Sequence, residues 1–373
     1  MDRLKPDNVM KLFKKDPVFS ISLILALISC TLSRPKADYI NFEVLACLFN
    51  LMVVVKAFEE LCFLDKVAVS ILNKCTDSRK VSLVMVLLSF FSSMVITNDV
   101  ALITLVPLTL IISRKSDMDM LVTVILQTLA ANLGSSLTPI GNPQNLYIFS
   151  YYRLTASQFF ASISFLAVSG LVWLCVLSLR SSKIEYELNL GNVDIKDKKK
   201  ATIWALLFII IILSVFDVIN YKIVFIATLI ITFFINKRLL LKVDYLLLAT
   251  FVCFFIFIGN ISNIPSVAEF MKQNLDDPVQ TYFSSILLSQ VISNVPCAIF
   301  LSKFTTYWKE LLLGVNIGGM GTIIASLASV ISYKLFVKDN PGSSRKYIGL
   351  FSLYNVISLG LFTFINYFIA IKR

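Results

Sequence analysis

Long apolar runs alternate with short charged segments along the chain. A membrane-spanning helix needs about 20 apolar residues, and several runs come close to this length. They are 17–33, 41–57, 157–180, 201–217, 221–236, 243–259 and 347–370. Segment 57–74 is too charged to span a membrane, and its pattern indicates an amphipathic helix on the membrane surface. The pattern predicts an all-α polytopic membrane protein.

Two further apolar regions, 81–113 and 279–307, are interrupted by a short polar segment. The interruptions are TND at 97–99 and SNVP at 293–296. Exposed backbone amides cost several kcal/mol each in lipid, so such a break must be covered by protein or line a cavity. We therefore expect both regions to be re-entrant helical hairpins, which enter the membrane and return on the same side.

Regions 119–152 and 308–336 are long and carry Gly, Pro or Asn near their middle. The same cost of exposed backbone applies to them. We expect both to be broken transmembrane helices, which cross the membrane with an irregular segment at mid-depth. Together with the simple spans they give about nine full crossings.

The distribution of Lys and Arg predicts the orientation. With the N-terminus inside, 25 of the 34 basic residues fall on inner segments, as the positive-inside rule requires. A cell membrane with a cytoplasmic N-terminus is the expected location. The expected organisation is a cytoplasmic segment 1–16, a first repeat 17–180, a cytoplasmic linker 181–200, a connecting transmembrane helix 201–217 and a second repeat 221–373.

The two halves resemble each other. NLGSSLTPIGNPQNLYIF, which starts at Asn132, aligns without gaps on NIGGMGTIIASLASVISY, which starts at Asn316. The polar interruptions at 97–99 and 293–296 precede these segments in the same order. Because a single additional span separates the halves, the second half is expected to be inverted relative to the first. Inverted repeats are typical of secondary transporters.

Hairpin tips and broken helices place helix ends inside the membrane. Free N–H groups at helix N-termini suit an anion, whereas free carbonyl, Asn and Thr oxygens suit a small cation. In the first half the candidate binding residues are Thr97, Asn98, Asp99, Asn132, Gly134, Ser135, Thr138, Gly141, Asn142, Pro143 and Asn145. In the second half they are Ser293, Asn294, Pro296, Asn316, Gly318, Gly319, Gly321, Thr322 and Ser326. The alternative role for these residues is helix packing and interhelical hydrogen bonding.

Asp99 is the one acidic residue that the pattern places deep in the membrane within a polar break. A carboxylate there is costly and is a functional candidate. We expect it to bind a cation or carry a proton, and the alternative is an ion pair with a basic neighbour. The expected Na⁺ ligands are Thr97, Asn98, Asp99 and Asn294.

Composition excludes several classes of function. Hydrophobic residues make up 57% and charged residues 15%, against roughly 45–50% and about 25% in soluble domains. There is no histidine, which excludes Ser-His-Asp catalysis and His-bound zinc. The net charge of +11 is explained by orientation, so no nucleic-acid partner is expected. A membrane enzyme and a channel remain the alternatives from other classes.

Four segments carry a family resemblance: TNDVALITLVPL, ANLGSSLTPIGNPQNL, SQVISNVPCAIFLS and NIGGMGTIIASLAS. They resemble the signature segments of the ion transporter superfamily, which includes divalent anion:sodium symporters, citrate transporters and arsenite permeases. In the dicarboxylate carriers both tips read Ser-Asn-Thr. Here Asn98, Ser293 and Asn294 match that motif, whereas the Asn98-Asp99 pair is more similar to the arsenite permease branch.

The resemblance implies an ion-coupled secondary active transporter, in a family that moves its substrate by an elevator mechanism and is often dimeric. The expected coupling ion is Na⁺ or H⁺, and no other cofactor is expected. The first expected substrate is a di- or tricarboxylate such as citrate, and the second is arsenite or a related metalloid oxyanion. The expected partners are therefore a small anionic substrate, the lipid bilayer and a second copy of the chain.

Overall fold

A computed structural model describes residues 17–116, 118–180, 183–184 and 190–372. Of the described residues 81% are helical, and none of them lies in a strand. Within the described part of the chain, five helices are long and apolar enough to cross a membrane. The prediction of an all-α polytopic membrane protein is thereby confirmed. The expected cytoplasmic segment 1–16 and much of the linker between 181 and 190 lie outside the described residues.

The same order of elements occurs twice: two helices, a short helix, a helical hairpin, a broken helix and a long final helix. The first set is α2 (Pro17–Leu32), α3 (Phe42–Glu60), α4 (Phe63–Leu72), α5 (Ser78–Ile96), α6 (Asn98–Ser116), α7 (Leu121–Ser135), α8 (Pro143–Tyr151) and α9 (Ala156–Leu179). Helix α10 (Lys198–Val215) follows.

The second set is α11 (Tyr221–Asn236), α12 (Tyr245–Ser262), α13 (Pro265–Asn274), α14 (Pro278–Ile292), α15 (Asn294–Leu301), α16 (Trp308–Gly318), α17 (Leu327–Asp339) and α18 (Ser344–Asn366). Short 3₁₀ turns lie at Ala37–Tyr39, Lys237–Lys242, Ile323–Ala325 and Pro341–Ser343, and a π turn at Tyr367–Ile371. Helices α2, α3, α9, α10, α11, α12 and α18 correspond to the simple spans expected from the sequence.

Polar residues fix where many helices begin. Asn41 accepts a hydrogen bond from the N–H of Val44 at the start of α3, and Asp77 accepts one from Lys80 at the start of α5. Thr155 and Gln158 form a capping box at the start of α9. Each cap satisfies an N–H that has no partner within its helix. These residues explain why the apolar runs become helices with defined N-termini.

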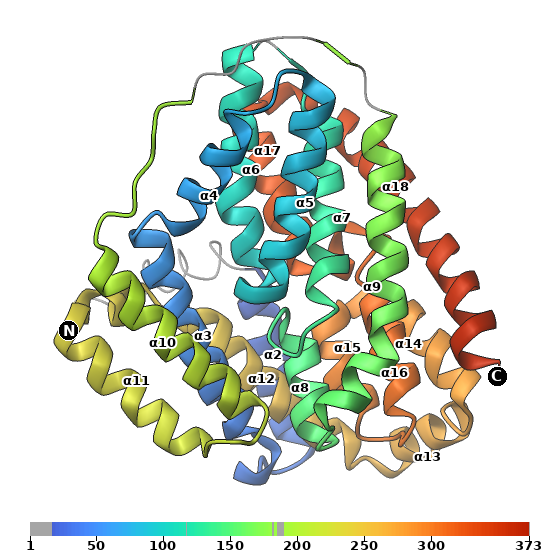
Figure 1. Ribbon diagram of the computed structural model, residues 1–373. Coiled ribbons are helices and arrows are strands. Elements are labelled where there is room, and N and C mark those ends of the chain that lie inside the picture. Colours follow the sequence, from blue (N-terminus) through green and yellow to red (C-terminus); the bar gives the residue numbers. More distant parts are fainter. Residues whose placement is uncertain (1–16, 117, 181–182, 185–189, 373) are drawn as a thin grey trace.

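The helical hairpins pack against the broken helices in the same way in both halves. Helix α5 lies along α7, and α14 lies along α16. Helix α17 packs on α6, and α8 packs on α15, so each hairpin also meets the broken helix of the other half. Figure 1 shows the first hairpin in the upper part of the molecule and the second in the lower part.

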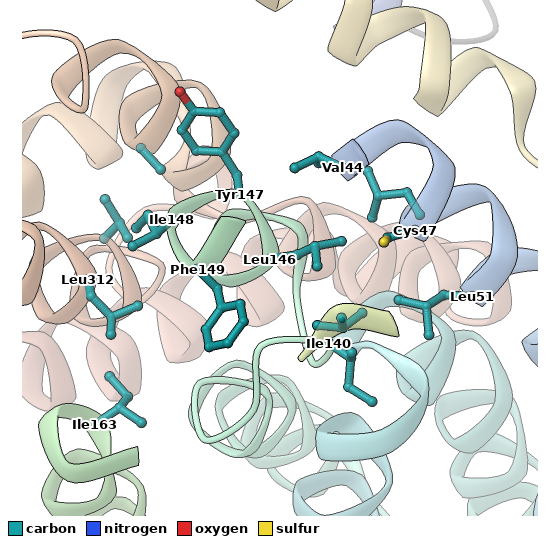
Figure 2. Packing of buried hydrophobic residues seen from close by; sticks show 14 of the residues in the cluster. Val44, Cys47, Leu51, Ile140, Leu146, Tyr147, Ile148, Phe149, Ile163 and Leu312 are labelled. Carbon is teal, nitrogen blue, oxygen red and sulfur yellow. The ribbon is translucent and has the colours of Figure 1, made fainter. Parts of the chain in front are cut away.

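Helix α8 lies in the middle of the apolar core. Leu146 points toward Cys47 of α3, and Ile148 points toward Leu312 of α16 (Figure 2). The ring of Phe149 packs on that of Phe159 in α9, with 5.8 Å between their centroids. This packing fixes the position of α8, which begins after the irregular segment that follows α7.

Ion pairs join segments that the Lys/Arg distribution assigns to the same side of the membrane. Arg114 pairs with Asp339, Lys346 with Asp119, and Lys66 with Asp194, all on segments expected inside. Lys242 also pairs with Glu60 there. At the other end, Arg153 pairs with Glu43 and lies 4.0 Å from Asp217. The fold thus gathers the two sets of loops at separate ends.

Two short helices border the hairpins. Segment 57–74 is not one helix: its first four residues belong to α3, which ends at Glu60. Most of the remainder forms α4, a separate helix whose buried residues Ala68, Val69 and Leu72 leave its other residues more exposed. Helix α13 occupies the matching place in the second half, and the sequence did not predict it. Its sequence PSVAEFMKQN is too polar to stand out as an apolar run.

Candidate functional site

Each hairpin turns at a single residue with the same unusual backbone. Thr97 has φ 74° and ψ 149°, and Ser293 has φ 72° and ψ 155°. Residues other than glycine are rare in this region, and such strain persists only where the surroundings enforce it. The N–H of Asn98 donates to the carbonyl of Gly141 at 3.0 Å, and the hydroxyl of Ser293 donates to the carbonyl of Ala325 at 3.3 Å. Each tip is therefore bonded to the break of its own half.

Thr138 and Thr322 tie each break to its hairpin. The hydroxyl of Thr138 donates to the carbonyl of Met94 at 2.6 Å, and that of Thr322 donates to the carbonyl of Gln290 at 3.0 Å. The two acceptors lie three residues before Thr97 and Ser293, so the contacts are equivalent. The structure gives these two candidate ligands a positioning role that the alignment alone did not predict.

Glycines allow the close approach of the broken helices to the hairpins. A Cβ at Gly134 would lie 2.1 Å from the carbonyl oxygen of Phe90, and one at Gly318 would lie 2.7 Å from the Cβ of Ser289. At Gly319 a Cβ would lie 2.8 Å from Nδ2 of Asn294, which places that buried tip residue against the second break. These contacts support the packing role of the glycines.

Two other glycines shape the breaks themselves. A Cβ at Gly141 would lie 2.3 Å from the carbonyl oxygen of Ser135. Gly321 has φ 104°, which strongly favours glycine, and a Cβ there would lie 2.2 Å from Oε1 of Gln290. Pro143 is the first residue of α8, and Pro296 lies in the first turn of α15, where a missing N–H costs no helical hydrogen bond.

A buried group of amides and hydroxyls joins the two halves. Nδ2 of Asn98 donates to Oδ1 of Asn132 at 3.2 Å, and the hydroxyl of Ser326 donates to the same oxygen at 3.0 Å. Nδ2 of Asn132 reaches the carbonyl of Gly319 at 3.4 Å. Asn132 of the first broken helix therefore links the first tip to the second break.

The reciprocal link runs through Asn142 and Asn316. Nδ2 of Asn142 donates to Oδ1 of Asn316 at 3.2 Å, and Nδ2 of Asn316 donates to Oδ1 of Asn145 at 2.7 Å. In the alignment Asn142 corresponds to Ser326 and Asn316 to Asn132. The break of each half thus donates to the paired Asn of the other half.

Asn145 fixes the irregular segment of the first break. Its Nδ2 donates to the carbonyls of Ser135, Ser136 and Thr138 at 3.3, 2.9 and 3.1 Å. Nδ2 of Asn142 also donates to the hydroxyl of Ser135 at 3.2 Å. These bonds satisfy carbonyls that would otherwise be left free at the end of α7.

Asp99 differs from its polar neighbours because part of its carboxylate has no partner. Oδ1 of Asp99 is buried and accepts no hydrogen bond from the described residues. Its backbone N–H donates to Oδ1 of Asn98 at 3.0 Å. None of the described Lys or Arg side chains forms an ion pair with it, so the ion-pair alternative finds no support. A free buried carboxylate oxygen of this kind is a suitable ligand for a cation or a site for a proton.

Four helices begin at the tips and breaks. Helices α6, α8, α15 and α17 begin at Asn98, Pro143, Asn294 and Leu327. Helix N-termini carry partial positive charge and free N–H groups, which favour an anion. The tips and breaks therefore offer helix N-termini that favour an anion, and the first turn of α6 also carries the buried oxygen of Asp99.

Gln290 is a site residue that the sequence analysis missed. Its Nε2 donates to the carbonyl of Gly318 at 2.6 Å, and its Oε1 accepts from the N–H of Thr322 at 2.9 Å. One side chain thereby bridges the second break. The equivalent position in the first half is Met94, so the two sites differ here as well as at Asp99 and Val295. A Gln three residues before a predicted tip was the available signal.

The helical fold, its apolar spans and the paired helix breaks define a multi-pass membrane protein of the transporter class. Residues 10–306 match the citrate transporter family, which is more than half of the chain. The chain belongs to this family. The match includes both hairpins and the first broken helix.

Similar proteins are transporters or membrane proteins by name. An uncharacterized transporter of Methanocaldococcus jannaschii is 36% identical over 319 residues, which cover 85% of this chain and 87% of that protein. The inner membrane protein YbiR of Escherichia coli is 29% identical over 325 residues, covering 85% and 84%. The protein arsB of Dictyostelium discoideum is 26% identical over 129 residues, covering 34% and 23%. The chain is a membrane transporter of the citrate/ArsB type.

Proposed function

We propose that this chain is an ion-coupled secondary active transporter of a small anion, with Na⁺ or H⁺ as the coupling ion. The observation that carries this proposal is the buried, unpartnered Oδ1 of Asp99 at the first hairpin tip. A buried carboxylate oxygen without a partner is costly, and a bound cation or proton would remove that cost. The helix N-termini at the same tips and breaks would receive the anion.

Asp99 also explains why ion and anion would depend on each other. An ionised carboxylate at the tip repels an anionic substrate, whereas a neutralised one does not. Asn98 joins this residue to Asn132, and Asn132 joins the second break through Ser326. Binding of the ion at the first tip would therefore affect the second break through these hydrogen bonds. Of the expected Na⁺ ligands, Asn98 and Asp99 are adjacent, Thr97 forms the turn, and Asn294 lies against Gly319.

The arrangement that we propose in the membrane is an inverted repeat with about nine crossings and a cytoplasmic N-terminus. The repeated order of elements and the matched contacts of Thr138 and Thr322 support the repeat. The clustering of basic segments at one end of the fold supports the orientation. A homodimer and an elevator movement are part of the proposal by resemblance.

Citrate or a related di- or tricarboxylate is the first proposed substrate, because the family match is to citrate transporters. Arsenite or a related oxyanion is the second, because the protein arsB is similar over the part of the chain that it covers. No observation among the described residues favours the membrane enzyme or the channel.

A transport panel in proteoliposomes separates these substrates. Purified protein would be assayed with labelled citrate, succinate and arsenite, each with an inward Na⁺ gradient, a proton gradient or neither. We expect gradient-dependent uptake of one carboxylate. Uptake of arsenite alone would select the second substrate, and uptake of none of them would contradict the proposed function.

A further inference from the structure

A cavity of about 340 Å³ lies away from the amide network, at the end of the fold where α3 begins. The other walls come from the C-terminal end of α8, the start of α11 and the turn after α15. The side chains that matter for its chemistry are Glu43, Tyr147, Tyr151, Arg153, Tyr221 and Lys303. In the proposed orientation this cavity opens to the outside.

Lys303 lines the cavity with a positive charge that is not paired with a carboxylate of the described residues. Its Nζ lies 4.8 Å from the centre of the Tyr151 ring, a cation–π contact that holds the ammonium in the cavity. None of the described carboxylates forms an ion pair with it. Arg153, by contrast, lies 3.4 Å from Glu43 and 4.0 Å from Asp217.

The rest of the lining suits an anion with a carbon skeleton. Helices α3 and α11 both begin at the cavity, with Phe42 and Tyr221 as their first residues, and their N-termini add partial positive charge to that of Lys303. The rings of Tyr147 and Tyr151 stack with 5.3 Å between their centroids and provide an aromatic wall. Asp38 is the lining acid without an ion pair among the described residues, and it lies on the exposed turn before α3.

Helix α8 connects this cavity to the central network. It begins next to Asn142, which bonds Asn316, and it ends at Tyr151 in the cavity wall. Its nine residues span about 13 Å at 1.5 Å per residue. The hydroxyls of Tyr147 and Ser302 lie 2.9 Å apart, so α8 is also bonded to the turn that carries Lys303.

We propose that this cavity is an anion-binding vestibule, in which Lys303 receives a carboxylate of the substrate before the substrate reaches the central site. The proposal rests on the proposed function, since it needs an anionic substrate. It assigns Lys303 to capture of the substrate and leaves the central network to binding and ion coupling. Removing the charge should therefore weaken capture without slowing the transport step itself.

The test compares Lys303→Gln with Lys309→Gln in proteoliposomes that take up labelled citrate under a fixed ion gradient. Lys309 is a matched control because it is a basic residue close in sequence whose Nζ donates to the carbonyl of Ala370 at 3.0 Å. For Lys303→Gln we expect KM to rise about tenfold with an unchanged maximal rate, and for Lys303→Arg we expect most of the affinity to return. Lys309→Gln should keep the wild-type KM.

Three outcomes would overturn the vestibule. The first is a Lys303→Gln protein that elutes as a folded species and has the KM of Lys309→Gln. The second is a fall in maximal rate without a change in KM. The third is a KM effect that occurs in liposomes containing phosphatidylglycerol and vanishes in pure phosphatidylcholine, because it would assign Lys303 to a lipid phosphate. If wild-type protein takes up no citrate at all, the proposed substrate fails instead.

Discussion

Gly134→Ala should destabilise the protein, because the new methyl group would meet the backbone of the first hairpin. The new Cβ would lie 2.1 Å from the carbonyl oxygen of Phe90 and 2.7 Å from Oγ of Ser93, whereas ordinary contact begins at 3.4 Å. Helices α5 and α7 would have to separate by more than 1 Å, because the obstructing atom belongs to the backbone. Overpacking of this kind costs about 1–3 kcal/mol.

The structure ranks three further substitutions for comparison. Gly318→Ala meets the side chain of Ser289 at 2.7 Å, and Gly170→Ala meets the flexible side chain of Leu133 at 3.0 Å. Gly349→Ala meets nothing within 4 Å and lies inside α18, where alanine is the better helix former. The expected loss of stability is therefore largest for Gly134→Ala, smaller for Gly318→Ala and smaller again for Gly170→Ala, and Gly349→Ala should lose none.

The assay is the apparent melting temperature of each purified variant in detergent, followed by intrinsic tryptophan fluorescence. Gly134→Ala should melt several degrees below wild type, and Gly349→Ala should melt at or above it. Equal melting temperatures for Gly134→Ala and Gly349→Ala would refute the close crossing of α5 and α7. A larger loss for Gly170→Ala than for Gly134→Ala would refute the reasoning as well.

Three further predictions concern the breaks and the orientation. Gln290→Met places the residue of position 94 here and removes the partner of the Gly318 carbonyl and of the exposed Thr322 N–H. The loss at the partly buried Gly318 carbonyl, about 1–3 kcal/mol, should lower the melting temperature, and an unchanged value would contradict the bridging role. Asn142→Ala and Asn316→Ala should each destabilise the protein, and the double variant should lose less stability than the sum of the two, since the bond between the two side chains can be lost only once; full additivity would contradict the link. Asn192→Cys, in a protein without its native cysteines, should react with an impermeant thiol reagent only after the cells are opened. Labelling of intact cells would contradict the proposed orientation and indicate the opposite one.

The helix breaks could be predicted from the sequence because their causes are local. A polar residue inside an apolar run, such as Thr97 or Ser293, interrupts the apolar pattern whatever the packing around it. Pro143 likewise excludes a continuous helix through that position. The helices of the first hairpin accordingly meet at Thr97 and those of the second at Ser293, and the irregular segments lie inside regions 119–152 and 308–336.

The partners of the polar residues could not be predicted, because they depend on how the halves pack. Thr138 and Thr322 were expected as ligands, whereas their hydroxyls bond hairpin carbonyls. The link between Asn142 and Asn316 joins residues 174 positions apart, which no local pattern encodes. The cavity around Lys303 was missed for the same reason, since four separate segments form it.

Concentrative uptake by wild type and Asp99→Asn measures whether Asp99 couples transport to the ion gradient. Labelled citrate would be presented to proteoliposomes with an imposed Na⁺ or proton gradient, and its internal and external concentrations would be compared at steady state. Wild type should accumulate citrate above the external concentration. Asp99→Asn, recovered at the wild-type melting temperature, should let citrate equilibrate without accumulating. Accumulation by Asp99→Asn to the wild-type level would contradict the assignment of ion coupling to Asp99.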